Sequence, residues 1–300
     1  MKRMKKLVSM GIIIAMLGTM TACGSSSKTT SDASSADSTA KTEAVATESA
    51  AAGTEIDTSN MGPTLQKVYD KGVLTVGIDS GYPPFSFTDP STGESYGIAV
   101  DIAQGVADKL GVELKVVPES FGTLLSDLQT DKLDMVCACV TVTDERKEVM
   151  AFSKPYIQTG DCMVVRTADA DQYSDLASFA GKTISANNGT SQQTNAESIE
   201  NATVVACEST SDAVLQVTSG TVDACVVDNV NGKQYIAASD GALMMIETAS
   251  FSYADKAIGI QLGNDDLVEI VNSVIDEINP NMDNLIDKYI DLSIDVLGVQ

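Results

Sequence analysis

Residues 128–142 read LQTDKLDMVCACVTV, and this stretch decides which fold the chain can adopt. A helical pattern ends, a turn follows, and an uninterrupted apolar run from Met135 is typical of a strand buried on both faces. Residues 217–229, VTSGTVDACVVDN, repeat this order of helix end, turn, Asp and buried strand. The two strands end in polar side chains, among them Thr141 in the first copy and Asp228 in the second.

Strands and helices alternate along the rest of the body. Strand character is expected at 73–79, 113–117 and 135–142, and helical spacing at 100–110 and 121–130. Asp144 should begin a further helix, with Thr143 as its N-cap. This alternation predicts an α/β fold with largely parallel sheets, and the repeat predicts two lobes of like construction. Because open α/β sheets bind ligands at the carboxyl ends of their strands, we expect one site in a cleft between the lobes.

The first 22 residues have the features of an export signal. Four basic residues precede an apolar run from Leu7 to Leu17, and small residues lead to MTAC, which ends at Cys23. This order predicts a signal peptide, whose apolar run is too short for a comfortable membrane span. MTAC resembles a bacterial lipobox, which implies that Cys23 is acylated and anchors the chain to the extracytoplasmic face of the cell membrane. An ordinary secretory signal with a chance cysteine is the alternative.

Residues 23–61 are expected to be the lipidated cysteine and a flexible tether. Apart from Val45, residues 24–55 are Ser, Thr, Ala, Gly, Asp, Glu and Lys. Such a segment has too little apolar surface to offset the entropy lost on ordering. An anchor and a tether predict a globular body that works near a membrane without entering it.

The charge and the cysteines limit the partners. Removing the four basic residues of 1–22 leaves 15 Lys and Arg against 42 Asp and Glu, a net charge of −27. A body this acidic is repelled by nucleic acid, so nucleic-acid binding is excluded. The five cysteines beyond Cys23 lie in apolar runs with strand character, at Cys137, Cys139, Cys162, Cys207 and Cys225. We expect buried free thiols, with a disulfide or metal site as the alternative, and predict no metal or cofactor.

Four segments resemble the extracellular solute-binding proteins of family 3, the amino-acid receptors of ATP-driven importers. They are VGIDSGYPPFSF (76–87), GIAVDIA (97–103), VTVTDER (140–146) and FSKPY (152–156), and the resemblance runs from about residue 72 to the C-terminus. It implies a two-lobed, type II periplasmic-binding-protein-like fold. Each lobe would be a mostly parallel sheet flanked by helices, joined to the other by two hinge strands near 156–162 and 251–257. Lobe 1 would comprise residues 62–158 and 254–300, and lobe 2 residues 159–253.

An α-amino acid carries a carboxylate and an ammonium on one carbon, and both need partners once they are buried. Arg146 can hold the carboxylate with two parallel hydrogen bonds, and Thr141 offers a hydroxyl at a strand end. Residues 187–191, NNGTS, form a glycine-containing loop that opens a helix, whose free N–H groups suit an anion.

The resemblance assigns the remaining contacts. Thr190 and Ser191 would bind the carboxylate from lobe 2, Asp228 would bind the ammonium, and Cys139 would lend its backbone carbonyl. Two aromatic residues would enclose the ligand side chain, and a carboxylate would lie at the far end of the pocket. The predicted set is Asp79, Tyr82, Phe121, Ala138, Cys139, Thr141, Arg146, Thr190, Ser191 and Asp228.

These assignments have structural alternatives. Arg146 is alternatively a solvated helix residue, Asp228 a cap for the helix that begins near Val230, and Asp79 a turn residue. Tyr82 and Phe121 alternatively belong to the core. Asp101 and Asp134 are interpreted as structural.

The resemblance implies a substrate-binding component of an ABC importer, which presents a free amino acid to a membrane permease. Relatives specific for cationic amino acids often have Asp at the position of Ala99, so a neutral polar ligand such as glutamine is favoured. Ligand held by lobe 1 would recruit Asp228 and the 190–191 loop and shift the population to a closed form. We expect a monomer.

The alternative function is a cyclohexadienyl-dehydratase-like enzyme on the same scaffold. Such an enzyme needs a general acid in the cleft, the chain has no histidine, and Glu119 is the nearest glutamate available. We therefore predict a binding protein without catalytic residues. A sensor domain would need a transmembrane segment and an output domain on the same chain, and the sequence contains neither.

Overall fold

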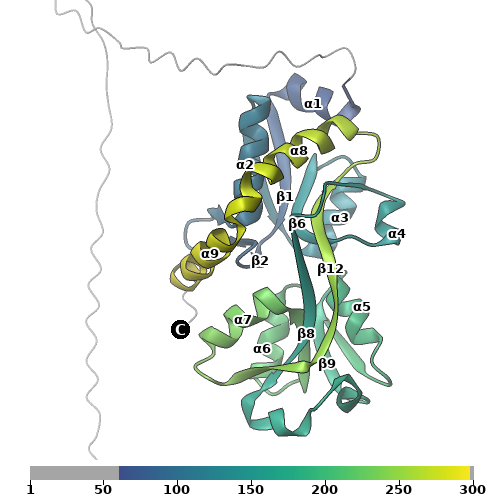
Figure 1. Ribbon diagram of the computed structural model, residues 1–300, viewed down its shortest axis with the longest axis vertical. Helices are drawn as coiled ribbons and strands as arrows, with labels where there is room; N and C mark the ends of the chain where they lie inside the picture. Colours follow the sequence, from purple (N-terminus) through teal and green to yellow (C-terminus); the bar gives the residue numbers. More distant parts are fainter. Residues whose placement is uncertain (1–60, 298–300) are drawn as a thin grey trace, which may run out of the picture. The chain divides into compact units, whose positions relative to one another are not determined.

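The computed structural model describes residues 61–297, which lie in one compact unit (Figure 1). The predicted signal peptide (1–22), the lipidated Cys23 and the tether up to residue 60 lie outside the described residues. Within residues 61–297, no helix combines the length and the apolar composition that a membrane crossing requires.

Within the described residues, nine strands form one mixed sheet in the order β10-β9-β11-β8-β12-β6-β1-β5, with β7 paired to β12. The strands on the lobe 1 side are β1 (Val73–Asp79), β5 (Glu113–Glu119), β6 (Met135–Thr141) and β7 (Ala151–Phe152). Those on the lobe 2 side are β9 (Thr183–Asn187), β10 (Thr203–Cys207) and β11 (Ala224–Asp228). In each group the neighbouring strands β5-β1-β6 and β10-β9-β11 run parallel, as the alternating pattern predicted.

Two long strands, β8 (Ile157–Arg166) and β12 (Leu243–Ile260), run from the lobe 1 strands to the lobe 2 strands and connect the two groups (Figure 1). They pair antiparallel with each other from Lys256 opposite Ile157 to Leu243 opposite Arg166. The register shifts twice, on either side of Ser250, so the ribbon is irregular near the predicted hinge at 251–257. The lobe boundaries at 158/159 and 253/254 stay a prediction, and lobe 1 and lobe 2 denote the residues on either side of these predicted boundaries.

Helices cover the faces of the sheet in both lobes (Figure 1). Lobe 1 carries α1 (Pro63–Lys71), α2 (Ile98–Leu110), α3 (Phe121–Gln129), α4 (Asp144–Lys147), α8 (Asp265–Ile278) and α9 (Met282–Leu297). It also carries a small antiparallel sheet of β2 (Gly81–Tyr82), β3 (Ser86–Thr88) and β4 (Ser95–Tyr96). Lobe 2 carries α5 (Ser191–Glu197), α6 (Thr210–Thr218), α7 (Asn229–Ala238) and short 3-10 turns at Thr167–Gln172 and Leu176–Phe179. A third 3-10 turn, Asn279–Asn281, joins α8 to α9.

Helix α2 begins two residues earlier than the predicted 100–110, because its apolar face already includes the buried side chains of Ile98 and Ala99. The chain enters α2 through Gly97, whose φ is +126°. A Cβ at Gly97 would overlap the carbonyl oxygen of Phe85, so only glycine fits this close approach.

The sequence repeat corresponds to a repeated structural unit. Asp134, just before β6, accepts a hydrogen bond from the Thr75 N–H at 2.7 Å, and Asp223, just before β11, accepts one from the Thr183 N–H at 2.8 Å. Each Asp thus joins the start of one strand to the parallel strand beside it. The prediction that Asp134 is structural is confirmed.

The hydrophobic core is divided between the lobes. One pair of buried clusters is built from β1, β6, α2, α3 and α8, and the other pair from β8, β9, β11, α5 and α6. All five cysteines of residues 61–297 are buried and free, which confirms the prediction of buried thiols.

Candidate functional site

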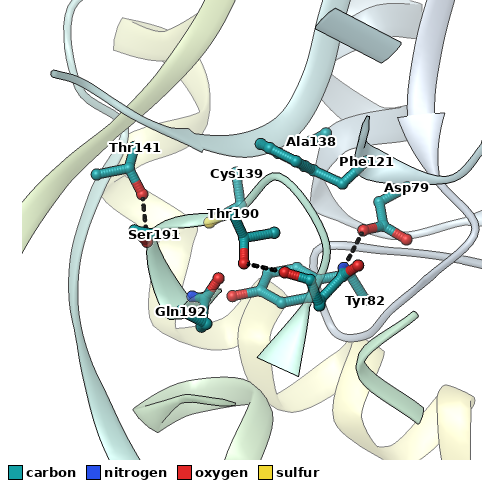
Figure 2. Close-up of a pocket in the computed structure, with 10 residues that line it drawn as sticks. Asp79, Tyr82, Phe121, Ala138, Cys139, Thr141, Thr190, Ser191 and Gln192 are labelled. Atoms are coloured by element: carbon teal, nitrogen blue, oxygen red, sulfur yellow. Dashed lines mark hydrogen bonds between the residues drawn. The ribbon is translucent and has the colours of Figure 1, made fainter. Parts of the chain in front are cut away.

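A narrow cavity of about 10 Å³ lies where the carboxyl ends of β1 and β6 face the β9–α5 loop (Figure 2). Its lining residues are Asp79, Tyr82, Phe121, Ala138, Cys139, Thr141, Asn187, Thr190, Ser191 and Gln192. Eight of these belong to the predicted set, while Asn187 and Gln192 do not. Both lobes therefore contribute to the wall of one cavity, as the strand-end residues predicted.

Asp79 closes one end of the cavity. It is the last residue of β1 and is only 2% exposed. Its Oδ1 accepts a hydrogen bond from the Gly81 N–H at 3.0 Å, and its Oδ2 accepts one from Asn187 Nδ2 at 3.3 Å. Burial raises the pKa of Asp79 from its ordinary value of 3.8 to about 6, because these two bonds offset only part of the lost hydration.

Asn187 contributes a free acceptor beside this carboxyl. It ends β9 and is buried, and its amide nitrogen is used by Asp79. Its Oδ1 atom is buried without a hydrogen-bond partner within residues 61–297. A buried acceptor without a partner costs free energy, so this oxygen is available to a ligand that brings an N–H or O–H group.

Two aromatic residues form apolar walls. Tyr82 stacks on Phe85 with ring centroids 5.6 Å apart, and Phe121 begins α3. Both side chains are buried and both line the cavity (Figure 2). The guanidinium carbon of Arg146 lies 5.3 Å from the centroid of the Phe121 ring, a cation–π distance.

Arg146 lies at the border of the cavity. Its helix, α4, begins after Thr143, whose hydroxyl accepts a hydrogen bond from the Arg146 N–H, as predicted for the N-cap. The guanidinium donates to the carbonyl oxygen of Thr141 at 2.8 Å and to that of Gly189, in lobe 2, at 3.1 Å. Burial lowers the pKa of Arg146, but a guanidinium stays charged at neutral pH. Within the described residues these bonds occupy two of its five N–H groups.

Arg146 lines a wider groove, of about 600 Å³, that adjoins the cavity. Thr141 and Ser191 line both spaces, and their hydroxyl oxygens lie 3.0 Å apart (Figure 2). Ser191 also donates to Asp161 Oδ2 at 3.2 Å, and Thr141 accepts from Lys256 Nζ at 2.8 Å. Because a hydroxyl has one hydrogen, Thr141 must donate to Ser191 in this arrangement. This hydroxyl pair forms the wall between the cavity and the groove.

The loop before α5 makes most of its bonds within itself. Thr190 caps α5 by accepting from the Gln193 N–H at 3.3 Å, and its hydroxyl donates to the Asn187 carbonyl at 2.6 Å. The Gly189 N–H donates to Gln193 Oε1 at 2.8 Å. The structure therefore places Thr190 and Ser191 at the cavity with the Gly189 N–H already bonded.

Asp228 is fully buried at the end of β11 and is not among the residues that line the cavity or the groove. Its Oδ1 accepts from the N–H groups of Val230, at 2.9 Å, and Asn231, at 3.4 Å, which caps α7. Its Oδ2 accepts from the Thr159 hydroxyl and lies 3.9 Å from Lys256 Nζ. Burial raises the pKa of Asp228, and the charge of Lys256 opposes that rise. Asp228 thus has the capping role of the structural alternative.

Two charged residues of the long strands were missing from the predicted set. Asp161 in β8 is buried and accepts from Ser191, Gln192 and Asn195. Lys256 in β12 is only 2% exposed and bonds Thr141. Each is a charged residue at the edge of an apolar strand run, next to Cys162 and Ala257 respectively, and that pattern could have marked both as buried and paired.

Several further contacts join the lobes around the cleft. The Asn231 side chain donates to the Pro83 carbonyl, and the Tyr235 hydroxyl lies 3.5 Å from the Gly81 carbonyl. A Cβ built on Gly189 would meet the Cα of Gly122, across the cleft, at 3.3 Å. The two lobes are therefore in direct contact over the cavity.

Residues 74–291 match the family model of bacterial extracellular solute-binding proteins, family 3. The chain therefore belongs to this family. It is 29% identical to the L-cystine-binding protein of Escherichia coli over 214 residues, which cover 71% of this chain and 80% of that protein. It is 30% identical to a probable histidine-binding protein of Campylobacter jejuni over 224 residues, which cover 72% and 84%.

The fold is also shared with solved structures. An amino acid ABC transporter substrate-binding protein from Streptococcus pneumoniae, bound to L-arginine, has a TM-score of 0.72 and 26% identity, with 76% of this chain and 99% of that chain covered. The predicted two-lobed fold class is confirmed.

A more distant relative is an enzyme. The cyclohexadienyl dehydratase of Pseudomonas aeruginosa is 25% identical over 196 residues, which cover 64% of this chain and 73% of that protein. In this chain Glu119 is not among the lining residues of the cavity. Glu119 lies opposite Asp79 in the register of β5 and β1. Burial and the charge of Asp127, on α3, raise the pKa of Glu119, and Lys132 opposes that rise.

Proposed function

We propose that this chain is the substrate-binding component of an ABC importer and that it captures a free amino acid in the cavity between its lobes. The observation that carries this proposal is the cavity itself, which residues of both lobes line and which shares the hydroxyls of Thr141 and Ser191 with the groove that Arg146 lines. The family to which the chain belongs, and relatives named for cystine and histidine, support an amino acid as the solute.

The carboxylate of the amino acid would bind at the border between the cavity and the groove. Arg146 has donors left there beyond its bonds to Thr141 and Gly189, and the hydroxyls of Thr141 and Ser191 face the same place. A guanidinium is a suitable donor for a buried carboxylate, and the Ser191 hydroxyl becomes one if it turns from Asp161 to the ligand. The ammonium would pair with Asp228 and with the Cys139 carbonyl.

The ligand side chain would extend between Tyr82 and Phe121 toward Asp79. That end of the cavity offers two acceptors, the Asp79 carboxyl and the unpartnered Oδ1 of Asn187. A side chain that carries N–H donors satisfies both, which favours a polar amino acid such as glutamine.

The chain would work at the outer face of the cell membrane. A signal peptide at 1–22, acylation of Cys23 and a tether to residue 61 would hold residues 62–300 close to a permease, and a diacylglyceryl group supplies the two chains that stable anchoring requires. Lobe 1 at 62–158 and 254–300 and lobe 2 at 159–253 would close as a monomer around the ligand.

A thermal-shift screen of the chain from residue 24 against the twenty amino acids and cystine tests this function. A ligand that binds only the native protein raises the melting temperature, so one or a few compounds should produce a dose-dependent shift. Absence of any shift across the panel would contradict amino-acid binding. Dehydration of a cyclohexadienyl substrate by the same preparation would instead support the enzyme.

A further inference from the structure

Lys256 has an unusual position for a lysine. It belongs to the crossing strand β12 and is 2% exposed, and its ammonium donates to the Thr141 hydroxyl at 2.8 Å. The same ammonium lies 3.9 Å from Asp228 Oδ2, at the end of a strand in lobe 2. One buried cation on the hinge therefore connects the lobe 1 strand β6 to the lobe 2 strand β11.

The surroundings explain why this cation stays buried. A buried charge needs an opposite charge and hydrogen bonds, and the carboxylate of Asp228 would be uncompensated without Lys256. Asp228 already caps α7 and accepts from the Thr159 hydroxyl, so Lys256 provides the positive charge of this network. Arg146 and Asp161 line the same groove as Lys256, but the bonds of Arg146 go to backbone carbonyls and those of Asp161 to α5.

This ion pair lies directly behind the cavity wall. Burial raises the pKa of the Cys139 thiol, which lines the cavity; the charge of Lys256 opposes this rise and the charge of Asp228 adds to it. Thr141, the acceptor for Lys256, lines the cavity as well. A primary ammonium group is therefore already held between a buried carboxylate and a hydroxyl beside the binding space.

We propose that Lys256 is an internal stand-in for the ammonium group of the ligand. In the protein without ligand it pairs with Asp228 and Thr141 and holds the lobes closed, and it leaves Asp228 when a ligand ammonium takes that place. The second half of this inference rests on the proposed amino-acid function, while the first half does not. Two ammonium groups cannot share one buried carboxylate without repulsion, so ligand and lysine compete.

Closure without ligand is tested first, by small-angle X-ray scattering of dialysed protein. Lys256→Met keeps the apolar stem and removes the charge, and Lys256→Gln keeps a donor for Thr141 without the charge. Both variants should show a larger radius of gyration than the wild type. Lys154→Met is the matched control, since it removes an ion pair with Asp276 that lies wholly within lobe 1, and its radius should not change. Unchanged scattering of both Lys256 variants would overturn the proposal.

The ammonium site is tested by chemical rescue with n-propylammonium. Lys256→Ala should melt at a lower temperature than the wild type, and n-propylammonium should restore part of the loss in proportion to the logarithm of its concentration. The neutral analogue 1-propanol should not, and neither compound should stabilise the wild type. Equal effects of the two compounds would show that the position does not recognise an ammonium. A Lys256→Ala chain that does not fold leaves the scattering of the Gln and Met variants to decide.

Competition is tested by calorimetric titration with L-glutamine, L-arginine and L-cystine. Lys256→Gln should bind about tenfold more tightly than the wild type, within the usual range of coupling between two sites, whereas Lys154→Met should be unchanged. Weaker binding by Lys256→Gln would make the lysine a ligand contact and overturn the competition. If no amino acid binds any variant, the proposed function fails, and the scattering and rescue results still decide the role of Lys256.

Discussion

The hydroxyl of Thr141, at the end of β6, lies 3.0 Å from the hydroxyl of Ser191, at the start of α5. Lys256 donates to the first hydroxyl, and the second donates to Asp161. Four side chains thus form a continuous line of hydrogen bonds that starts on the crossing strand β12, passes through both lobes and ends on the crossing strand β8. The cavity wall and the hinge are parts of one polar network, so a substitution in either should change the strength of the hydrogen bonds in the other.

A double-mutant cycle on Thr141→Val and Ser191→Ala measures this link. The coupling free energy in unfolding by urea should be about 1 kcal/mol, because the two hydroxyls lie in a partly buried site where water replaces the bond poorly. Ser120 and Thr123 are a control pair, with hydroxyls also 3.0 Å apart but exposed, and their coupling should be near zero. Equal coupling free energies in the two pairs would show that the interlobe hydrogen bond stabilises the protein no more than an exposed one.

Asp79 should make stability depend on pH. Its pKa in the folded protein is about 6, above the ordinary 3.8, so the folded state binds the proton more tightly. Once other groups are subtracted, the free energy of unfolding should therefore fall by about 3 kcal/mol as pH rises from about 3 to about 7, with about 2 kcal/mol of that fall between pH 4 and pH 6. Asp79→Asn should lack this pH dependence, so the contribution of Asp79 is the difference in the free energy of unfolding between the wild type and the variant at each pH. Asp171→Asn, an exposed control, should retain the slope, and a slope that survives in Asp79→Asn would refute the assignment.

Substitutions at two glycines with positive φ distinguish the cost of backbone strain from the cost of a steric clash. Gly93→Ala, at φ +77° in open space, should destabilise the protein by about 1–2 kcal/mol. Gly97→Ala adds a clash with the Phe85 carbonyl, so we expect about 3 kcal/mol or more. Urea unfolding of both variants measures the difference. Equal losses would show that the entry to α2 tolerates a side chain.

Cys23→Ser tests the anchor. The wild-type chain expressed in a bacterial host should sediment with membranes and incorporate labelled palmitate, and Cys23→Ser should do neither. Cys207→Ser, a change of the same kind at a cysteine in lobe 2, should behave as the wild type. Membrane association that persists in Cys23→Ser would exclude the cysteine as the attachment point.

The fold could be predicted from short sequence patterns because each of its repeated units is formed by residues that are close together in the sequence. The stretches before Met135 and Ala224 each contain a helix end, an Asp and a buried strand, and the structure gives Asp134 and Asp223 the same bond to a neighbouring strand. The length of β12 could not be predicted. In its first part only every third residue is buried (Leu243, Ile246 and Ala249), residues 250–255 are not buried, and residues 256–260 are wholly buried, so periodicity gives no single strand from Leu243 to Ile260.

The cavity could be predicted because its residues stand at strand ends and helix starts. Asp79, Thr141 and Phe121 all lie at such positions, which the sequence pattern locates to within a few residues. Lys256 and Asp161 could not be found in this way. Their partners lie far along the chain, Thr141 being 115 residues from Lys256 and Gln192 being 31 residues from Asp161, and only the folded chain brings them together.

The most direct test of amino-acid capture is calorimetric titration of wild type and Arg146→Ala with the amino acid that gives the largest thermal shift. We expect one ligand per chain for the wild type and a loss of about 2–5 kcal/mol for Arg146→Ala, roughly 30- to 5,000-fold, because a buried carboxylate loses its partner. Lys147→Ala, which changes the exposed neighbour in α4, should bind as the wild type. Unchanged affinity of Arg146→Ala would contradict a carboxylate held by this guanidinium in the cleft.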